Sequence, residues 1–457
     1  MDADPALERA FELAGSYLAG VRSRPVWWRL PYEQMVERLR CPLQRESLPA
    51  EQVVAELAGW ADPGLAATGS GRYFGFVVGG AQPAALGADW LALAWDQNAG
   101  LLNLAPAASA AETVAAGWIL ELLDLPREAA VGFTTGATVS GFVCLGAARH
   151  RVLAQAGHDV EARGLAGGPP VRILAGADRH ISIDLAVRYL GLGTDNVELV
   201  DTDEDGRIDV QDLRRRLSNG SGPTIVCLQA GEVHTGAFDQ FAPAISAARE
   251  AGAWVHVDGA FGLWARAGNR ARTLTEGVDA ADSWSTDAHK TLNVPYDSGL
   301  AIVRDADAMV AAFGVHGDYL MPGSTSEPHD KTPEMSRRAR GFAIWAALRA
   351  MGADGVAALP DRLHDRAVRM AEGIRRIEGA RVHNEVVFTQ VMASFGDDDQ
   401  TEEVGRRLLA DGTAAITPAT WRGRKVQRIS LSNWCTTEAD VDATVEALSR
   451  ISAEIRA

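Results

Sequence analysis

The chain has 457 residues, an ordinary composition for a soluble globular protein and a formal net charge of −16. A chain this long predicts two or three substructures that share one large core. The acidic excess argues against a nucleic-acid-binding or anionic-membrane-binding surface, because either would need clusters of basic residues.

The cysteines and the N-terminus predict where the protein resides. Four cysteines stand far apart, at positions 41, 144, 227 and 435, with no CxxC pair. This spacing fits neither a disulfide framework nor a zinc finger, so we expect reduced thiols in a cytoplasmic protein. The first residues lack a basic segment followed by an apolar one, so we do not expect a signal peptide. No apolar run is long enough to predict a membrane span.

Two short helices are predicted near the N-terminus. Apolar residues at helical spacing predict one helix over 4–20, and residues 48–60 predict another. Between them, Pro25 and Pro31 flank two tryptophans in the stretch RPVWWRLPYEQ. Short helices bury little surface alone, so we expect this arm to pack on another domain or subunit.

From about residue 110 onward, predicted helices alternate with short apolar strands. The alternation predicts a mainly parallel sheet covered on both faces, with ligands at the carboxyl ends of its strands. The predicted helices are 112–125, 138–157, 183–193, 213–219 and 241–252, and the predicted strands are 171–176, 196–203, 224–231, 254–261, 285–290 and 299–305.

The last third of the chain predicts a loop followed by a small α+β domain. Residues 314–336 are polar and contain three prolines, which predicts a long binding loop or lid. After this loop we expect helices over 337–352 and 363–379, strands over 386–395 and 426–434, and a closing helix over 439–455. The predicted domains are therefore an N-terminal helical arm (1–72), a large α/β domain (73–327) and a small C-terminal domain (328–457).

One segment predicts an anion site. GFTTGATVSG, residues 132–141, fits a strand, a turn of small residues and the start of a helix. Backbone N–H groups at a helix N-terminus bind anions, and small residues let a phosphate approach. Ala137 and Thr138 would supply N–H groups, and Thr138 also a hydroxyl. Taken alone, the segment fits a tight turn with ordinary helix capping as well.

Two further groups follow predicted strands. His180 opens a helix, where it is either a capping or surface residue or a ring that stacks on a ligand. Asp258 closes an apolar strand, where a buried carboxylate needs a cation or a strong donor. Gly259 and Ala260 leave flat room beside it, so the spacing fits a planar ring whose nitrogen meets Asp258. A helix N-cap or a structural salt bridge is the alternative for Asp258.

The stretch STDAHKTLNVPYDSG contains a candidate nucleophile, Lys290, directly after His289. Alone, Lys290 would be a solvated surface residue, whereas a lysine in a desolvated pocket becomes a nucleophilic amine. An anion site, a stacking ring, a carboxylate and an amine are together what pyridoxal 5′-phosphate needs. We therefore expect Lys290 to form a Schiff base with the aldehyde of this cofactor.

At this point the chain resembles the group II pyridoxal-phosphate-dependent amino-acid decarboxylases, which include aromatic-amino-acid and glutamate decarboxylase. The resemblance implies a fold type I, transferase-like α/β fold with a mainly parallel seven-stranded sheet. It also implies an amino-acid substrate and a homodimer with active sites at the interface. The motifs that carry it, in the family's order and spacing, are FTTGATVSG, HISIDLAVRYLGLG, AGEVHTGAFDQF, HVDGAFG, DAHKTLNVPYDSG and SRRARGFAIWAALRAMG.

The resemblance assigns roles to single positions. Lys290 would be the Schiff-base lysine and Asp258 the partner of the pyridine nitrogen, while His180 would stack on one face of the ring and Ala260 pack on the other. The phosphate would contact Ala137, Thr138 and His289. The substrate pocket would include Phe74 and Phe76.

Three positions depart from the family pattern. Glu232 stands where many members have threonine close to the ring, so it would tune the cofactor or contact a cationic substrate. Thr291 follows the lysine where tryptophan is common. The loop from Tyr319 to Arg338 is short and has no tyrosine beyond Tyr319, although related enzymes use a loop tyrosine to protonate the substrate carbon. His329 is the best proton donor left there, and a solvated loop residue is the alternative.

These assignments predict an amino-acid decarboxylase that releases carbon dioxide and an amine. Arg428 can dock a carboxylate through two parallel hydrogen bonds, or else lie on the surface. Rival reactions on the same fold are oxidative decarboxylation with deamination to an aldehyde, another lyase reaction at Cα or Cβ, and transamination. A non-enzymatic scaffold is disfavoured, because it has no need of a nucleophilic amine.

Overall fold

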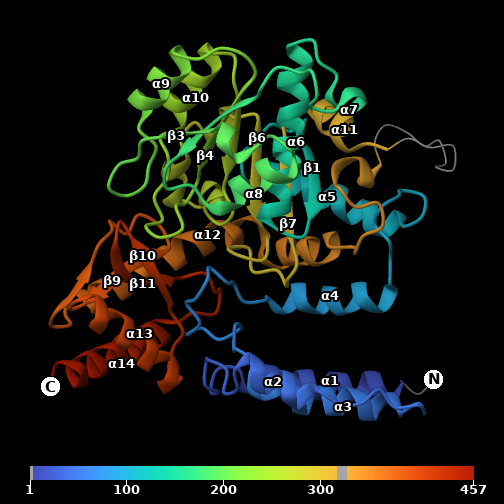
Figure 1. Cartoon of the computed structure of the whole chain (residues 1–457). Helices are drawn as coiled ribbons and strands as arrows, with labels where there is room; N and C mark the ends of the chain where they lie inside the picture. Colours follow the sequence, from blue (N-terminus) through green and yellow to red (C-terminus); the bar gives the residue numbers. More distant parts are fainter. Residues whose placement is uncertain (1–3, 316–326) are drawn as a thin grey trace. The chain divides into compact units, whose positions relative to one another are not determined.

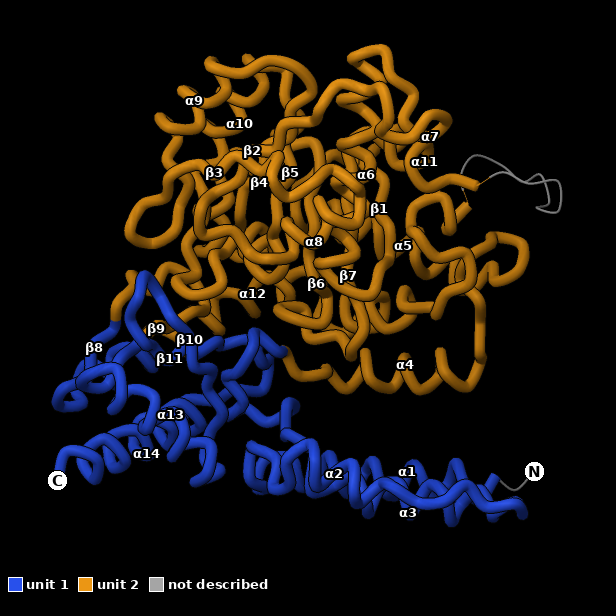
Figure 2. The backbone as a smooth tube through the Cα atoms, viewed as in Figure 1, with its two compact units in different colours: residues 1–78, 369–382, 393–457 blue, residues 79–368, 383–392 orange. Residues whose placement is uncertain are grey.

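The computed structural model describes residues 4–315 and 327–457, which form two compact units. Unit 1 consists of residues 1–78, 369–382 and 393–457, and unit 2 of residues 79–368 and 383–392 (Figure 2). The N-terminal arm and the last part of the chain thus fall in one unit. The predicted division at residues 72/73 and 327/328 stays a prediction.

A seven-stranded sheet forms the centre of unit 2, in the order β1-β7-β6-β5-β4-β2-β3 (Figure 1). The pairs β3–β2, β2–β4, β4–β5 and β5–β6 are parallel, whereas β7 runs antiparallel to both of its neighbours. The predicted mainly parallel sheet is confirmed. Its strands are β1 Ala130–Thr134, β2 Arg172–Gly176, β3 Val197–Val200, β4 Thr224–Gln229, β5 Trp254–Asp258, β6 Ser283–Asp287 and β7 Gly299–Val303.

Burial explains why these short runs form strands. Strands β1, β4, β5, β6 and β7 are buried at every residue, as expected of a sheet covered by helices on both faces. Helix α6 (Ala137–Gln155) packs on β5, β6 and β7, and α8 (Ile181–Tyr189) and α11 (Ala306–Phe313) pack on α6. This packing places the N-terminus of α6 near the ends of the central strands.

Unit 2 contains helices that the sequence did not predict, namely α4, α7 (Val160–Arg163) and α11. Helix α4 (Pro83–Trp95) is apolar on nearly every side and buries only Ala85 and Ala92, so it lacks the periodicity of an amphipathic helix. The others are α5 Pro106–Leu122, α7 Val160–Arg163, α9 Val210–Ser218 and α10 Phe241–Glu250, with 3-10 helices η2 Thr194–Asn196, η3 Gly262–Ala267, η4 Ala271–Thr275, η5 Val278–Ala280 and η6 Pro328–Lys331.

Helix α12 (Gly341–Arg375) joins the two helices predicted over 337–352 and 363–379, and Gly352 interrupts it with non-helical backbone angles. The predicted start at residue 337 is wrong, because the main chain of Arg337 bonds Asn98 and Ala99, while its side chain forms a buried ion pair with Glu112 of α5. By length and composition alone, α12 could cross a membrane, which qualifies the expectation that no run was long enough. Arg349, Asp354 and the break at Gly352 speak against that use.

Unit 1 combines the N-terminal helices with a four-stranded sheet in the order β10-β11-β9-β8. The predicted helices near the N-terminus and the closing helix are confirmed, whereas α2, α13, β8 and β10 were not predicted. Trp27 stacks on Tyr73 with ring centroids 6.3 Å apart, beside Val26 and Ala415. The elements are α1 Pro5–Gly20, α2 Tyr32–Leu39, α3 Ala50–Ala61, η1 Asp62–Gly64, β8 Ala380–Val382, β9 Gln390–Phe395, α13 Asp398–Asp411, β10 Thr417–Trp421, β11 Arg424–Ser430 and α14 Glu438–Arg456.

Candidate active site

Lys290 lies in the turn that follows β6, and a buried carboxylate holds its amine. Nζ of Lys290 is 2.8 Å from Oδ2 of Asp287, the last residue of β6. Oδ1 of Asp287 accepts the N–H of Ala137, the first residue of α6, at 2.5 Å. The lysine and the N-terminus of α6 therefore meet at one carboxylate. The predicted proximity of Lys290 to an anion-binding turn is present in unit 2.

His289 packs beside this group. Its Nε2 is 3.5 Å from Oδ1 of Asp287, and its Nδ1 accepts the N–H of Ser298. The ring of Tyr296 stacks on it, with ring centroids 4.1 Å apart. Burial lowers the pKa of His289, and the neighbouring Lys290 acts in the same direction, against the opposing effect of Asp287. The lowered pKa favours a neutral imidazole, which can still donate one hydrogen bond to a phosphate oxygen.

Asp258 ends β5, the strand beside β6, and a serine connects it to His180. Oδ2 of Asp258 accepts the hydroxyl of Ser182 at 3.1 Å, and Oδ1 accepts the N–H of Ala260 at 3.2 Å. The Ser182 hydroxyl also lies 2.8 Å from Nδ1 of His180, the N-cap of α8. Each carboxylate oxygen keeps a second lone pair, so Asp258 can accept a further donor such as a ring N–H.

The turn before α6 is shaped for close approach. A Cβ at Gly299 would lie 2.5 Å from Cα of Gly136, so the turn and the start of β7 can touch only without side chains. The first N–H groups of a helix have no acceptor within it. The carboxylate of Asp287 accepts the N–H of Ala137, and the next N–H along α6 belongs to Thr138.

Glu232 lies in the loop after β4, and its carboxylate serves that loop. Oε2 accepts the N–H groups of His234 and Thr235 at 2.6 and 2.7 Å, and Oε1 lies 2.8 Å from Nδ1 of His234. These hydrogen bonds stabilise the conformation of the loop, which is a structural reason for an acid at position 232. Its predicted contact with cofactor or substrate stays a prediction. Thr291, the other departure, is buried and donates its hydroxyl to the carbonyl of Phe261.

His329 is not the solvated loop residue of the alternative interpretation. It lies in η6 with its side chain 3 % exposed, and its N–H donates to the carbonyl of Gly100. Within residues 4–315 and 327–457, neither ring nitrogen has a hydrogen-bond partner, although Nδ1 is 3.4 Å from Oδ1 of Asp330. The described part of the predicted loop thus includes a short helix, and Tyr319 lies outside the described residues. A proton-donor role for His329 stays a prediction.

The predicted substrate residues belong to unit 1, whereas Lys290 belongs to unit 2. Unit 1 brings Phe76 close to the strand that carries Arg428, because the Phe76 N–H donates to the hydroxyl of Thr417, the strand partner of Arg428. The main chain of Phe74 bonds Ala415 and Ser430, and its side chain is buried. Phe76 is 54 % exposed and has a φ of 55°, an unusual conformation for a bulky residue. A shared pocket with Lys290 stays a prediction.

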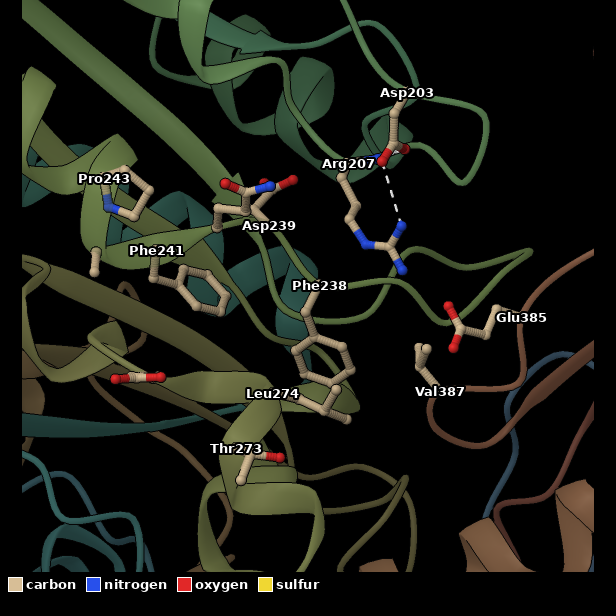
Figure 3. A pocket seen from close by; sticks show the side chains of 13 residues that line it. Asp203, Arg207, Phe238, Asp239, Phe241, Pro243, Thr273, Leu274, Glu385 and Val387 are labelled. Carbon is tan, nitrogen blue, oxygen red and sulfur yellow. Dashed lines mark hydrogen bonds and ion pairs between the residues drawn. The ribbon is translucent and has the colours of Figure 1, made fainter.

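A separate cavity of about 540 Å³ opens elsewhere in unit 2 (Figure 3). Its lining includes Asp239 and Phe241 at the start of α10, with Arg207, which pairs with Asp203 at 3.3 Å. None of the predicted site residues lines it. The residues that carry the predicted chemistry therefore gather away from this cavity, at the ends of β5 and β6.

Two residues of the site escaped the sequence analysis, Asp287 and Ser182. Asp287 ends a buried strand as Asp258 does, and it lies three residues before Lys290, but its strand reads Ser-Trp-Ser-Thr, so no apolar run marked it. Ser182 stands two residues after the helix-opening His180, where a hydroxyl can bond back to the cap. Its bond to Asp258 joins residues 76 positions apart, and local pattern gives no sign of it.

A half-buried lysine after a strand, an acid at the end of the adjacent parallel strand and a helix N-terminus beside both define a fold type I pyridoxal-phosphate enzyme. The chain belongs to the pyridoxal-dependent decarboxylase family, whose conserved-domain model matches residues 33–395.

Individual relatives agree with this assignment. An acidic amino acid decarboxylase of Mus musculus is 27% identical over 291 residues, which are 60% of this chain and 52% of the relative. The match thus spans about half of that relative. Tryptophan decarboxylase 1 of Oryza sativa is 25% identical over 98% of this chain and 93% of its own.

Solved structures show the same fold. Oryza sativa TDC with PLP and tryptamine superposes with a TM-score of 0.92 at 23% identity, covering 100% of this chain and 99% of that one. The 4-hydroxyphenylacetaldehyde synthase of Rhodiola rosea gives 0.88 at 20% identity, covering 98% and 97%. These likenesses confirm the predicted fold class.

The cofactor of this family is pyridoxal 5′-phosphate, and the residues present fit it. Lys290 is partly exposed, so its amine is within reach of an aldehyde. The acceptor capacity left on Asp258 suits a protonated ring nitrogen, and the N-terminus of α6 already binds one carboxylate, that of Asp287, as expected of a site for an anion. Within the described residues, no group of side chains suits a metal ion.

Proposed function

We propose that the protein is an amino-acid decarboxylase that holds pyridoxal phosphate through Lys290 and releases carbon dioxide and an amine. One observation carries the proposal: Nζ of Lys290 lies at the N-terminus of α6, with Asp258 at the end of the adjacent strand. Relatives named as acidic amino acid and tryptophan decarboxylases support the same reaction. These two differ in substrate, so the proposal names an amino acid without choosing its side chain.

Each residue would have a defined task. Bound pyridoxal phosphate supplies an electron-withdrawing ring that weakens the bonds at the substrate Cα. Lys290 would hold the cofactor by a covalent bond and yield its place to the substrate amine. Asp258 would keep a proton on the ring nitrogen, and Ser182 would orient its carboxylate. The N–H and hydroxyl of Thr138 and the ring of His289 would bind the phosphate.

The path of the proton to Cα separates the candidate reactions. His329 is our proposed proton donor, and Arg428 with Phe74 and Phe76 our proposed substrate contacts. Oxidative decarboxylation with deamination is the second candidate, favoured by the likeness to a 4-hydroxyphenylacetaldehyde synthase. Another lyase reaction or transamination on the same fold is the third.

Borohydride reduction tests the cofactor linkage. The chain has only three lysines, at positions 290, 331 and 425, so peptide mapping can assign the reduced cofactor without ambiguity. We expect it on Lys290 in the unmodified protein and in Lys331→Ala, and we expect its loss in Lys290→Ala. Cofactor fixed at another amine would contradict the proposal.

A product screen tests the reaction. Incubation with the common amino acids should release carbon dioxide and an amine without oxygen uptake. Peroxide and ammonia together with an aldehyde would establish the oxidative reaction instead, and a keto acid would establish transamination. No turnover of any amino acid by protein that carries the cofactor on Lys290 would refute the proposed activity.

We further propose a cytoplasmic homodimer with active sites at the interface. All four cysteines are free thiols, in keeping with a reducing compartment. Large apolar side chains are exposed on α1 of unit 1, at Leu7 and Phe11, and on α4 of unit 2, at Leu91 and Leu93. Exposed apolar surface of this kind is typical of subunit interfaces.

A further inference from the structure

Within residues 4–315 and 327–457, Asp287 is the acid that contacts both Lys290 and the N-terminus of α6, where the phosphate would bind. Its side chain is 2 % exposed. Its carboxylate lies 2.8 Å from Nζ of Lys290, 2.5 Å from the N–H of Ala137 and 3.5 Å from Nε2 of His289. Three groups expected to hold the cofactor are therefore already engaged by an anion that belongs to the chain itself.

The main chain of Asp287 is fixed on both sides. Its N–H donates to the carbonyl of Ala260 at 2.8 Å, and its carbonyl accepts the indole N–H of the buried Trp264 at 2.9 Å. The backbone therefore cannot retreat when a ligand enters. Only rotation of the side chain can withdraw the carboxylate from the N-terminus of α6.

A phosphate would need the donors that Asp287 now uses. A helix N-terminus attracts one anion through its first free N–H groups and its dipole, and a second negative charge at the same point is repelled. That repulsion is strong in a buried pocket, because little water screens it. The covalent bond of Lys290 to the cofactor would also remove the ammonium that pairs with Asp287.

We propose that Asp287 is an internal competitor for the phosphate of the cofactor. Its carboxylate occupies the N-terminus of α6, where the phosphate would bind. It stays paired with Lys290 until the cofactor displaces it. The inference rests on the proposed linkage of the cofactor to Lys290. It predicts that Asp287 weakens the binding of the phosphate group specifically, whereas a simple helix cap would leave the contribution of the phosphate unchanged.

Comparison of pyridoxal phosphate with pyridoxal, which lacks the phosphate, isolates this effect. Cofactor-free full-length protein is titrated with each compound, and the absorbance of the lysine-bound form gives two dissociation constants. Their ratio, pyridoxal over pyridoxal phosphate, measures what the phosphate contributes. In Asp287→Asn, which keeps the shape but removes the charge, we expect this ratio to rise at least about fivefold over that of the unmodified protein.

A matched control is Asp282, the acid that directly precedes the first residue of β6. Asp282→Asn also removes one negative charge, and the side chain of Asp282 accepts the N–H of Val255, away from Lys290 and the N-terminus of α6. In Asp282→Asn, the ratio of the two dissociation constants should stay within about twofold of that of the unmodified protein. The competition of inorganic phosphate with pyridoxal phosphate should also stay within about twofold. Inorganic phosphate should compete with pyridoxal phosphate more strongly in Asp287→Asn, since the same donors are then released.

An unchanged or lower ratio in Asp287→Asn would overturn the proposal, and so would an equal rise in Asp282→Asn. Asp287→Ser, which is also neutral, takes its place if the asparagine variant does not fold by circular dichroism. Peptide mapping after borohydride reduction separates this outcome from failure of the proposed function. Cofactor on Lys290 with an unchanged ratio rejects only the role of Asp287, whereas cofactor absent from Lys290 in the unmodified protein rejects both.

Discussion

The hydroxyl of Ser182 is the smallest group on which the candidate site depends. It donates to Oδ2 of Asp258 at 3.1 Å and lies 2.8 Å from Nδ1 of His180. A hydrogen bond to a charged group contributes about 1.5 to 3 kcal/mol. Ser182 therefore sets the orientation of a carboxylate that would otherwise keep only the N–H of Ala260.

We expect Ser182→Ala to weaken the binding of pyridoxal phosphate about tenfold or more, because Asp258 loses the donor that orients it toward the ring nitrogen. Titration of cofactor-free protein measures the affinity, and the pH dependence of the bound cofactor's absorbance reports the altered carboxylate. Ser182→Thr keeps the hydroxyl and should restore most of the affinity. Unmodified affinity and an unmodified pH profile in Ser182→Ala would show that the bond is incidental.

Single residues of the site could be predicted where they end a strand, and not where their partner is distant. Asp258 follows an apolar run, so its place at the edge of the sheet followed from the pattern, whereas Lys290 follows a polar run and was identified from its motif. The carboxylate of Asp287 bonds the N–H of Ala137, 150 positions earlier, which no local pattern encodes. Glu232 looked like a cofactor contact, yet its oxygens bond its own loop.

At the level of elements, prediction succeeded where hydrophobicity was patterned. Strands such as β4 and β5 are continuous apolar runs between helices, and the sequence located both. Helix α4 was missed because apolar residues surround it and leave no period to detect. The predicted start of α12 failed because the main chain of Arg337 bonds Asn98 and Ala99 instead of a helical turn, and sequence alone gave no sign of these distant partners.

Two buried groups on neighbouring elements give the fold opposing pH dependences. Burial lowers the pKa of His256 in β5 to about 4, and burial raises the pKa of Asp239, in the connection from β4 to α10, to about 6. Between pH 4 and 6.5 the unfolded chain protonates His256 while the folded chain does not, so stability falls as the pH falls. Between pH 3.8 and 6 only the folded chain protonates Asp239, so its contribution to stability is lost as the pH rises.

We therefore expect Asp239→Asn to steepen the rise of unfolding free energy between pH 4 and 6, by up to about 1.4 kcal/mol per pH unit relative to the unmodified protein. His256→Gln should change the slope by a similar amount in the opposite sense. Urea unfolding of cofactor-free protein, followed by circular dichroism at several pH values, measures both slopes. Parallel curves for Asp239→Asn and the unmodified protein would contradict the raised pKa.

At the level of the whole molecule, unit 2 exposes a large apolar surface of the kind that another protein usually covers. A groove of about 600 Å³ runs between α4, α5 and α12, and its lining includes Leu91, Trp95, Val114, Phe342 and Trp345. Leu91 and Leu93 of α4 are 50 % and 60 % exposed. A second copy of the chain is the occupant that we propose, because a monomer rarely exposes so much contiguous apolar surface.

We expect the purified protein to have twice the 48.6 kDa mass of one chain. The double substitution Leu91→Asp with Leu93→Asp should shift it toward the monomer, because burying a leucine contributes about 1.5 to 3 kcal/mol and a buried unpaired carboxylate opposes association. Sedimentation velocity over a range of concentrations measures the change, which we expect to exceed about a hundredfold in the dimer dissociation constant. Tyr189→Asp on α8, also at an exposed helical position, is the control and should remain dimeric. A double variant as dimeric as the control would place the subunit contact on another face.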